Sequence, residues 1–411
     1  RQMTEARRQM TGDRGQQPGT SAGMVQAGPG NHPAQGVRLH GELVEEGCIE
    51  CGLCEKDCRF LQRYGSPKKI AGRIMAAAAD LRFSFECSLC GLCTAVCPKE
   101  VDPATMFAEM RVAGREQGCG EFRQHAGLLR YESLGASPWF SWYGLPAGCD
   151  TVFFPGCAMA GTRAARITQV YRHLRTMIPT LGLVLDCCTK PSHDLGRRDS
   201  FQRLFGALRQ ALEEKGVRTV LVTCPSCYRV WSDYGGSVAV RSVYEELAAR
   251  APLRQVGGRE VLTVHDPCPT RNDTGVHAAV RSLLTAMGFA LREMKHHGRR
   301  TVCCGEGGAA CHLVPAMAGN WTAIRAGEAD GQRIITYCAG CTSFLGRRTP
   351  ASHVLDLYFA PGPTLAGRNL VARSPWTWLA RLLLRARAKS LVRPAVFGSR
   401  GKDGRVILRE R

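Results

Sequence analysis

The sequence predicts an α+β and α/β protein in which a small helical domain precedes two duplicated α/β domains. Three observations support this prediction: two cysteine runs near the N-terminus, a cysteine pattern that occurs twice behind them, and short apolar runs that alternate with helix-like stretches. With 411 residues, the chain is long enough for two or three domains. Its composition, 44% apolar and 22% charged residues, is ordinary for a globular protein with a sizeable core.

Changes in composition and motif divide the chain into six segments. Residues 1–44 are expected to be a disordered leader, because most of this stretch is rich in Gly, Gln, Pro and Ser. The other segments are a small helical domain (45–115), a linker (116–150), two duplicated domains (151–258 and 259–372) and a basic amphipathic tail (373–411).

The 21 cysteines of the chain suit metal binding better than disulfide formation. They fall in CxxC and CC units, and adjacent or serial cysteines make poor disulfide frameworks but good metal frameworks. No secretory signal is visible in the sequence. We therefore expect a cytoplasmic, reducing environment in which iron holds the thiols as thiolates.

Residues 45–115 contain two cysteine runs of identical spacing. The runs are Cys48, Cys51, Cys54 and Cys58, and then Cys87, Cys90, Cys93 and Cys97. In bacterial two-cluster ferredoxins, three cysteines of one such run and the fourth of the other hold one [4Fe–4S] cluster. The spacing therefore predicts two [4Fe–4S] clusters, one bound by Cys48, Cys51, Cys54 and Cys97, the other by Cys87, Cys90, Cys93 and Cys58. Zinc is the alternative, but zinc sites typically pair two CxxC units.

Two details of this segment bear on the match to a two-cluster ferredoxin domain. Pro98 follows the last cysteine of the second run, whereas Arg59 stands at that place in the first run. Between the runs, Pro67–Phe83 carries apolar residues at helical spacing, among them Ile70 and Ile74. We expect an amphipathic helix there.

The second half of the chain repeats one cysteine pattern: a single cysteine, a CC pair and a CxxC unit. The two copies are Cys157, Cys187, Cys188, Cys224 and Cys227, and then Cys268, Cys303, Cys304, Cys338 and Cys341. The first members of corresponding groups are 111, 116 and 114 residues apart. A repeat in the same order at nearly constant spacing indicates an internal duplication.

Short apolar, β-rich runs precede these cysteine groups. Strands are expected at 151–154, 181–185, 219–223, 261–264, 300–302 and 334–337, and helices at 164–177, 201–215 and 278–287. Alternating strands and helices indicate parallel α/β units, in which ligands collect at the carboxyl ends of the strands. Each sheet is therefore expected to bring five thiols from distant sequence positions to one point.

The motifs around these cysteines resemble the cysteine-rich CCG domain. They are Phe154-Pro-Gly-Cys157, Cys187-Cys-Thr-Lys-Pro191, Cys224-Pro-Ser-Cys227, His265-Asp-Pro-Cys268, Cys303-Cys-Gly-Glu-Gly-Gly308 and Cys338-Ala-Gly-Cys341. Thr189 stands where the first copy would usually carry a glycine. CCG domains occur in heterodisulfide reductases and in the iron–sulfur subunits of glycolate oxidase and anaerobic glycerol-3-phosphate dehydrogenase. A ferredoxin-type segment followed by two CCG domains is similar to the D subunit of heterodisulfide reductase, and the resemblance covers about residues 45–358.

This resemblance has implications for cofactors and catalysis. In that family, complete five-cysteine motifs can hold noncubane [4Fe–4S] clusters that cleave a disulfide in two one-electron steps. Both motifs are complete here. The resemblance therefore implies one or two further, noncubane clusters, with the ten duplicated cysteines as metal ligands and catalytic residues. The residues alone indicate only two thiolate-rich metal sites, so a cubane cluster with a spare thiol, or zinc in one site, are the alternatives.

Several further residues near the motifs are open to two interpretations. His193, His265 and Arg271 are candidates for proton donation or for binding an anionic substrate, with local capping and hydrogen bonding to sulfur as the alternative. Asp266 is expected to be a helix or turn cap. We expect the remaining cysteines to serve packing; they are Cys119, Cys149 and Cys311.

Nucleotide-binding motifs are not found in the sequence. The glycine-rich run after Cys303 lacks the Lys-Ser/Thr end of a P-loop and the GxGxxG spacing of a dinucleotide site. Its glycines are better explained by backbone amides that approach sulfur. We therefore expect a redox partner subunit to supply or accept electrons, either a flavoprotein dehydrogenase or a membrane cytochrome or quinone subunit.

The formal net charge is +20, and nearly half of it lies on the tail, where residues 373–411 hold 11 Lys/Arg and 2 Asp/Glu. A predicted tail helix places Trp376, Leu379, Leu382, Leu383 and Ala386 on one face and Arg381, Arg385 and Lys389 on another. This pattern suits contact with an anionic membrane surface, peripherally on the inner face, or with a membrane subunit. Packing on the protein itself is the alternative. No nucleic-acid module is recognised, so no nucleic-acid partner is expected.

The leading interpretation is an iron–sulfur oxidoreductase subunit of a complex. It would relay electrons through two [4Fe–4S] clusters to the CCG sites and reduce a disulfide there. The alternative is a non-catalytic electron-transfer subunit of a membrane-associated dehydrogenase of the glycolate or glycerol-3-phosphate type. A zinc-stabilised scaffold without redox activity is a third interpretation.

Overall fold

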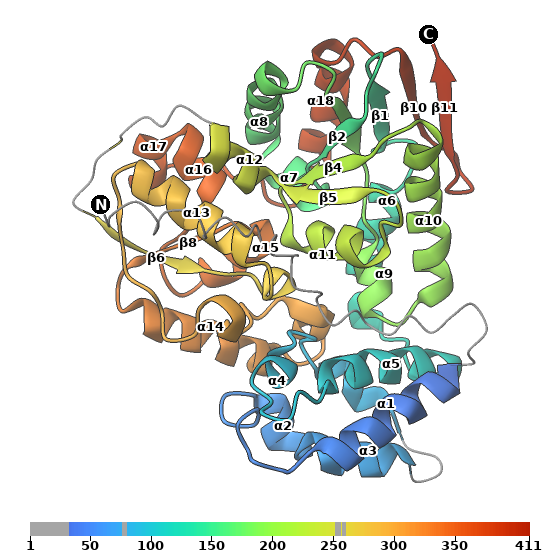
Figure 1. The fold of residues 1–411 in the computed structure, drawn as a ribbon, viewed down its shortest axis with the longest axis vertical. Coiled ribbons are helices and arrows are strands. Elements are labelled where there is room, and N and C mark those ends of the chain that lie inside the picture. The colour runs from blue at the N-terminus through green and yellow to red at the C-terminus, as the bar shows by residue number, and fades with distance from the viewer. Residues whose placement is uncertain (1–32, 76–79, 251–255, 257–259) are drawn as a thin grey trace, which may run out of the picture.

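The computed structural model describes residues 33–75, 80–250, 256 and 260–411. Figure 1 shows a helical N-terminal domain at the bottom of the view and two α/β domains side by side above it. One buried apolar cluster runs through both α/β domains and includes Tyr171 and Leu247 of the first and Val280 and Leu357 of the second. The two duplicated domains are therefore packed on each other by a shared core.

The N-terminal domain consists of short helices. In chain order they are α1 (Pro33–Gly47), α2 (Arg59–Tyr64), α3 (Pro67–Met75), the 3-10 helix η1 (Arg82–Glu86), α4 (Leu92–Ala95) and α5 (Pro103–Glu116). Phe60, Ile70 and Phe107 lie in its core. The carboxylate of Asp102 accepts a hydrogen bond from the Thr105 backbone N–H and so caps the start of α5.

Two expectations for this region are corrected by the structure. Residues 33–44 belong to α1, which packs on α3 and α5 and buries Val37 and Val44, so this part of the expected leader is ordered helix. Residues 1–32, the rest of that leader, lie outside the described residues. The helix expected over Pro67–Phe83 is described only as α3, and Phe83 lies in the 3-10 helix η1 rather than in an α-helix.

The first α/β domain is built on a seven-stranded sheet of order β11-β10-β1-β3-β2-β4-β5, in which β3, β2, β4 and β5 are parallel. Its strands up to β5 are β1 (Trp142–Leu145), β2 (Thr151–Phe154), β3 (Gly182–Leu185), β4 (Thr219–Val222) and β5 (Ala239–Ser242). Its helices, with the elements that lead into it, are η2 (Arg123–His125), α6 (Ala126–Gly135), α7 (Cys157–Thr162), α8 (Ala164–Met177), α9 (Lys190–Asp194), α10 (Arg198–Glu214), α11 (Pro225–Tyr234) and α12 (Val243–Arg250). Strand β1 lies within the expected linker 116–150 and pairs with β3, so the end of that linker is part of this sheet.

The second α/β domain has a four-stranded parallel sheet of order β7-β6-β8-β9. Its strands are β6 (Val261–His265), β7 (Ala290–Leu291), β8 (Arg333–Thr336) and β9 (Ala351–His353). Its helices are η3 (Cys268–Thr270), α13 (Thr274–Ala286), η4 (Gly298–Arg300), η5 (Gly307–His312), α14 (Pro315–Ala329), α15 (Ala339–Leu345), α16 (Val354–Phe359) and α17 (Pro361–Leu365). In chain order this repeats the topology β3-β2-β4-β5 of the first domain, so the duplication of the cysteine pattern is also a duplication of the fold.

Most of the expected strands and helices occur where the sequence predicts them. Strands β2, β3, β4, β6 and β8 fall within a residue of their expected bounds, and α8 matches 164–177. The strand expected at 300–302 is wrong. Gly298 N–H and the Thr301 hydroxyl donate to the side-chain and backbone oxygens of Asp266, so polar bonds to the loop after β6 replace a strand ladder there. The strand that takes its place is β7.

The C-terminal segment returns to the first α/β domain rather than forming a separate tail (Figure 1). It consists of α18 (Trp376–Leu391), β10 (Val396–Arg400) and β11 (Val406–Glu410). Strand β10 pairs with β1 and with β11, and α18 packs on α7 and α8. In the part of the chain that the structure describes, no helix is long and apolar enough to cross a bilayer.

Helix α18 buries one of its arginines and exposes several of its large apolar side chains. Arg381, expected on an exposed basic face, is only 4% exposed, because it lies among the rings of Tyr131, Phe140 and Trp378. The apolar stripe faces outward instead. Its exposed side chains are Trp376 (65%), Leu379 (47%), Leu382 (40%) and Leu383 (61%).

A buried ion pair joins the C-terminal hairpin to the loop that carries the first CC pair. The Arg400 guanidinium donates to both carboxylate oxygens of Asp186, at 2.8 and 3.0 Å, and also to the backbone oxygens of Leu204 and Gly404. Both side chains of the pair are fully buried. The hydroxyl of Tyr143 is a further donor to Asp186. Asp186 directly precedes Cys187, so this pair fixes the start of the cysteine loop.

We predict that Arg400→Met lowers the free energy of unfolding by about 3–5 kcal/mol, because it leaves the Asp186 carboxylate buried without its cation. The control is Arg405→Met on the same hairpin, since Arg405 is paired with Asp403 in solvent and its side chain is 85% exposed. The measurement is anaerobic urea unfolding of both variants. Equal unfolding midpoints would show that the pair does not fix the hairpin.

Candidate metal centres

Two cavities in the helical domain are lined by the cysteines of the two runs. The residues around the first include Cys58, Cys87, Cys90 and Cys93, with Phe60, Leu92 and Trp321 among the apolar walls. Those around the second include Cys48, Cys51, Cys54, Cys97 and again Cys93. Each cavity therefore combines three cysteines of one run with the fourth cysteine of the other, which is the grouping that the spacing predicts. Cluster binding by these residues stays a prediction.

Two of the thiols around these cavities have a strongly raised pKa. Burial raises the pKa of Cys54 to about 12, and burial together with the neighbouring Cys303 thiol raises the pKa of Cys90 to about 12. Metal ions bind the thiolate, so an iron centre would supply the positive charge that these sites need. All 21 cysteines are free in the structure. Their donor set fits iron–sulfur clusters.

The first α/β domain gathers its five cysteines at the carboxyl ends of its strands. Cys157 opens α7 after β2, the pair Cys187–Cys188 follows β3, and Cys224 and Cys227 stand at the start of α11 after β4. The sulfur atoms of Cys157 and Cys187 are 3.8 Å apart, and the thiols of Cys188 and Cys224 both interact with Cys227. We call this group site one.

The charge environment of site one includes a cation from the C-terminal helix. The hydrogen bond from Cys187 and, to a smaller extent, the guanidinium of Arg381 lower the pKa of Cys157 to about 7. The Nη1 atom of Arg381 has no hydrogen-bond partner among the described residues. Arg381 therefore stabilises the thiolate form of Cys157 in site one.

The second α/β domain gathers its five cysteines in the same way. Cys268 lies in η3 after β6, the pair Cys303–Cys304 precedes η5, and Cys338 and Cys341 stand at the start of α15 after β8. Cys303 interacts with Cys268 and Cys304, and Cys341 interacts with Cys304 and Cys338. We call this group site two. Both sites have the thiols that a metal cluster needs. Cluster binding by these thiols stays a prediction.

The glycine-rich loop of site two serves two purposes. The Gly305 N–H donates to the sulfur of Cys303 at 3.3 Å, as expected for an amide that approaches a thiolate. The loop also presses against the ferredoxin-type domain, because a Cβ at Gly307 would lie 2.5 Å from the backbone oxygen of Ser88. Arg271 donates to the backbone oxygen of Cys90 across the same contact. Site two thus lies against the first cavity.

Arg111 joins the helical domain to both α/β domains. Its side chain is fully buried on α5 and donates to four backbone oxygens. These are the oxygens of Ser84 (3.0 Å), Cys87 (2.5 Å), Asp194 (2.7 Å) and Gly308 (2.7 Å). Asp194 lies in α9 near site one and Gly308 lies in the glycine-rich loop of site two. Burial lowers the pKa of Arg111 to about 10.

The structure gives local partners to most of the additional candidates. The ring nitrogens of His193 lie 2.9 Å from the Tyr234 hydroxyl and 3.1 Å from the Asp194 carboxylate. Arg271 is bonded to the Cys90 and Arg299 carbonyls. Asp266 accepts two bonds from Arg281 and one from an N–H of η4, so it ties loops together rather than capping its own turn.

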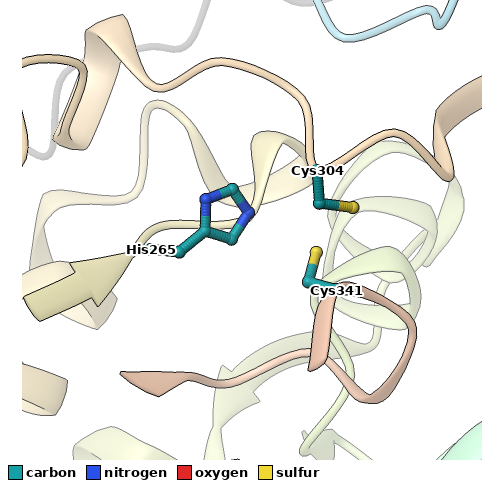
Figure 2. A group of neighbouring side chains, drawn as sticks. All are labelled: His265, Cys304 and Cys341. Carbon is teal, nitrogen blue, oxygen red and sulfur yellow. The ribbon is translucent and has the colours of Figure 1, made fainter. Parts of the chain in front are cut away.

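His265 differs from these residues. It is fully buried, and neither ring nitrogen has a hydrogen-bond partner among the described residues. Figure 2 shows its ring facing the side chains of Cys304 and Cys341, whose sulfur atoms lie within 4.8 Å of a ring nitrogen. Burial lowers the pKa of His265 to about 3, so the imidazole is neutral.

The three remaining cysteines each donate to a backbone oxygen. The sulfur of Cys119 is 3.1 Å from the Gly114 backbone oxygen, that of Cys149 is 3.3 Å from the Thr151 oxygen, and that of Cys311 is 3.8 Å from the Glu306 oxygen. This environment is consistent with packing.

Four residues around the sites could not be selected from motifs. Arg111, Arg325 and Arg381 are buried arginines outside the cysteine motifs, and Tyr244 lies between the two sites. Its hydroxyl oxygen is 2.8 Å from the Thr223 oxygen and 3.2 Å from the Tyr337 oxygen. The sequence signal for the arginines is weak: an arginine among apolar positions of a helix, as at Arg111 in α5.

Comparison with known proteins agrees with this description. Residues 45–101 match the 4Fe-4S dicluster domain, and residues 151–230 and 262–346 match the Cysteine-rich domain. The chain is 26% identical to the B subunit of fumarate reductase (CoM/CoB) of Methanothermobacter marburgensis, over 72% of its own length and 66% of that protein. It is 22% identical to the D subunit of dihydromethanophenazine:CoB–CoM heterodisulfide reductase of Methanosarcina barkeri, over 67% and 82%. It is 24% identical to a probable membrane-anchored ferredoxin of Chromohalobacter salexigens, over 73% and 56%.

The chain therefore belongs to the iron–sulfur proteins in which a 4Fe-4S dicluster domain precedes two cysteine-rich domains. Within this class it is similar to the D subunit of heterodisulfide reductase and the B subunit of fumarate reductase, and it spans just under two thirds of the latter. Its relatives are iron–sulfur subunits of oxidoreductases, so the chain has a redox role, and its domains indicate 4Fe-4S clusters.

We predict that Arg111→Met lowers the free energy of unfolding by about 3 kcal/mol or more, because four buried carbonyl oxygens lose a donor. It should also speed the loss of iron, since two of these carbonyls belong to the Cys87 and Gly308 loops. The control is Arg115→Met, one turn later on α5, whose guanidinium pairs with the solvent-exposed Glu121. Iron release into a chelator and thermal unfolding are the measurements. Identical behaviour of the two variants would contradict the role given to Arg111.

Proposed function

We propose that this chain is the disulfide-reducing iron–sulfur subunit of a redox complex. In this proposal the two cavities of the helical domain hold [4Fe–4S] clusters, and sites one and two each hold a further, noncubane [4Fe–4S] cluster. The observation that carries the proposal is the continuity of the four cysteine groups through the protein. The redox partner is a subunit of the flavoprotein dehydrogenase type or of the membrane cytochrome or quinone type.

The continuity is supported at each step by named contacts. Cys93 lines both cavities, so the two groups in the helical domain adjoin. The thiol of Cys90 in the first cavity influences the pKa of Cys268 in site two and is itself influenced by Cys303. Tyr244 then links site two to site one through the residues that precede Cys338 and Cys224.

The reaction proposed at the CCG sites is the reduction of a disulfide. Two electrons from the partner subunit and two protons convert one disulfide into two thiols. When bound, the clusters supply one-electron redox chemistry. The residues of the chain hold them, compensate their charge through Arg381, and surround them with buried apolar side chains that limit access of water.

A second candidate function is electron transfer without disulfide chemistry. The exposed apolar stripe of α18 favours it, because such a surface is suited to docking on a membrane or a partner. A relative named EtfAB:quinone oxidoreductase, 26% identical over 40% of this chain, is consistent with that role. Under this alternative, sites one and two position the partner and do not react with substrate.

The first test is the metal and substrate chemistry of the full chain. Anaerobically purified protein should contain about 16 irons and as many labile sulfides, at four per cluster. It should reduce an organic disulfide with a viologen donor, and addition of a thiol should produce a new EPR signal. About 8 irons, at four per cluster, and no thiol response would confine the clusters to the helical domain and favour the second candidate.

We further predict that the protein binds vesicles containing anionic lipid through α18. The apolar stripe can insert while the exposed Arg387 and Lys389 attract lipid phosphates. Leu379→Glu together with Leu383→Glu should abolish co-flotation with such vesicles. The matched control is Leu43→Glu, another exposed leucine on the distant helix α1. Flotation that survives the double substitution would exclude α18 as the contact.

A further inference from the structure

The two cysteine-rich sites differ in the side chains that stand behind the sulfur atoms. Counting back from Cys157 and Cys268, Phe154 in the first copy corresponds to His265 in the second, and Val152 corresponds to Thr263. Counting back from Cys224 and Cys338, Val222 corresponds to Thr336. The sheet face behind site one is therefore apolar, whereas the same face behind site two carries an imidazole and two hydroxyls.

In site one these positions belong to an ordinary apolar core. Val152, Phe154 and Val222 pack with Phe205 and Trp231, and all five side chains are buried. Nothing in this wall can donate to a metal. The sheet face behind site one, as formed by these residues, therefore offers no metal donor.

In site two the corresponding polar atoms are left without partners. His265, Thr263, Thr336 and Arg325 are each 0% exposed. The two ring nitrogens of His265, both threonine hydroxyls, and the Nε and Nη2 atoms of Arg325 have no hydrogen-bond partner among the described residues. A buried polar group that stays unsatisfied loses its hydration without compensation and so destabilises the fold. This many unpaired groups in one place indicates an occupant that pairs with some of them.

The position of the imidazole identifies the kind of occupant. In Figure 2 the His265 ring faces the sulfur atoms of Cys304 and Cys341. A ring nitrogen and these two sulfur atoms lie within 4.8 Å of one another. Donor atoms that share one tetrahedral metal lie roughly 3.5–3.8 Å apart, given metal–sulfur and metal–nitrogen bonds of about 2.3 and 2.0 Å. Small side-chain movements bring the three donors onto one metal.

The surroundings of His265 favour metal binding over a structural role. It stands at the last position of β6, in register with Thr336 of β8, so the sheet fixes its backbone. The hydroxyls of Thr263 and Thr336 and the Nε and Nη2 atoms of Arg325 also lack partners among the described residues, so none of them satisfies the ring. The guanidinium of Arg325 lies close enough to Cys304 and Cys341 to interact with them electrostatically, and it places a positive charge beside the thiolates.

We propose that His265 donates a ring nitrogen to the iron–sulfur group of site two, so that site two has a mixed thiolate–imidazole donor set and site one a thiolate set. This inference rests on the proposed function, since it requires a cluster in site two. An imidazole is neutral where a thiolate is negative, so a ring nitrogen that takes the place of one of the five thiolates favours the reduced state of a cluster. The two duplicated sites are therefore unequal, and site two retains an electron more readily than site one.

The experiment uses the full chain, purified anaerobically after labelling with ¹⁵N-histidine. Pulsed EPR of site two should show a strongly coupled ¹⁵N nucleus, several-fold above the coupling of a hydrogen-bonded nitrogen. Cys157→Ser and Cys268→Ser variants assign the signals to site one and site two, respectively. Because the labelled wild-type protein gives the answer, the test does not depend on the folding of a substituted site.

Two variants complete the test. His265→Phe, which installs the residue found at Phe154, should lose the ¹⁵N coupling while the iron content of the helical domain is kept. His277→Phe is the matched control, because His277 is also buried in the second domain with an unpartnered ring nitrogen but lies on α13. It should leave the coupling unchanged.

The possible results separate this inference from the proposed function. A site-two signal without strong nitrogen coupling would overturn the role of His265 and leave the proposed function standing. Absence of iron from site two, seen as an unchanged iron content in Cys268→Ser, would overturn both. A coupling that persists in His265→Phe would assign the nitrogen to another histidine and overturn the inference.

Discussion

The structure depends on one buried arginine at the point where its three domains meet. Arg111 donates to carbonyl groups of the helical domain, of α9 in the first α/β domain and of the glycine-rich loop in the second. A guanidinium has five N–H donors in a rigid plane, so it can satisfy several fixed carbonyls at once where a lysine could not. The burial of this charge is tolerated because these carbonyls accept its hydrogen bonds and the carboxylate of Asp194 lies near enough to attract it. The relative position of the cysteine groups follows from this junction.

The two copies of the duplicated domain have the same fold but different neighbouring elements. The parallel strand order is the same in both copies, and both place five thiols at the carboxyl ends of the strands. The first copy is extended by β1, β10 and β11 and receives Arg381 from α18. The second copy keeps only four strands and instead contacts the ferredoxin-type domain through Gly307 and Arg271. Both copies therefore have their sulfur atoms at corresponding positions, and the neighbouring elements give each site its own charge and polarity.

Local patterns in the sequence were sufficient to predict much of the fold. Cysteine spacing and short apolar runs predicted the domain order, most strands and the grouping of Cys58 and Cys97 with the opposite runs. The errors occurred where tertiary contacts override local preference. The sequence of residues 300–302 is typical of a strand. No strand forms there, because the Gly298 N–H and the Thr301 hydroxyl donate to oxygens of Asp266. Arg381 of α18 was expected on an exposed basic face, but rings of α6 and the following loop bind its guanidinium and bury it.

Site residues outside the motifs were beyond prediction for a related reason. Arg111 and Arg381 act on carbonyls and thiols that are far away in the sequence, and no spacing rule connects them. His265 was recognisable as a candidate, because it precedes a cluster cysteine. The contrast with Phe154 follows from the sequence, but the lack of hydrogen-bond partners for His265 is visible only in the structure.

The return of the C-terminal segment to site one has a consequence for the order of biosynthesis. Asp186 and Cys157 are made before the second α/β domain, but the residues that compensate them, Arg400 and Arg381, follow that whole domain along the chain. The helical domain and site two contain all of their cysteines by residue 341. Site one therefore completes its surroundings last, although its cysteines precede those of site two along the chain. A nascent chain interrupted before residue 376 would carry the ten thiols of both sites but only one finished site.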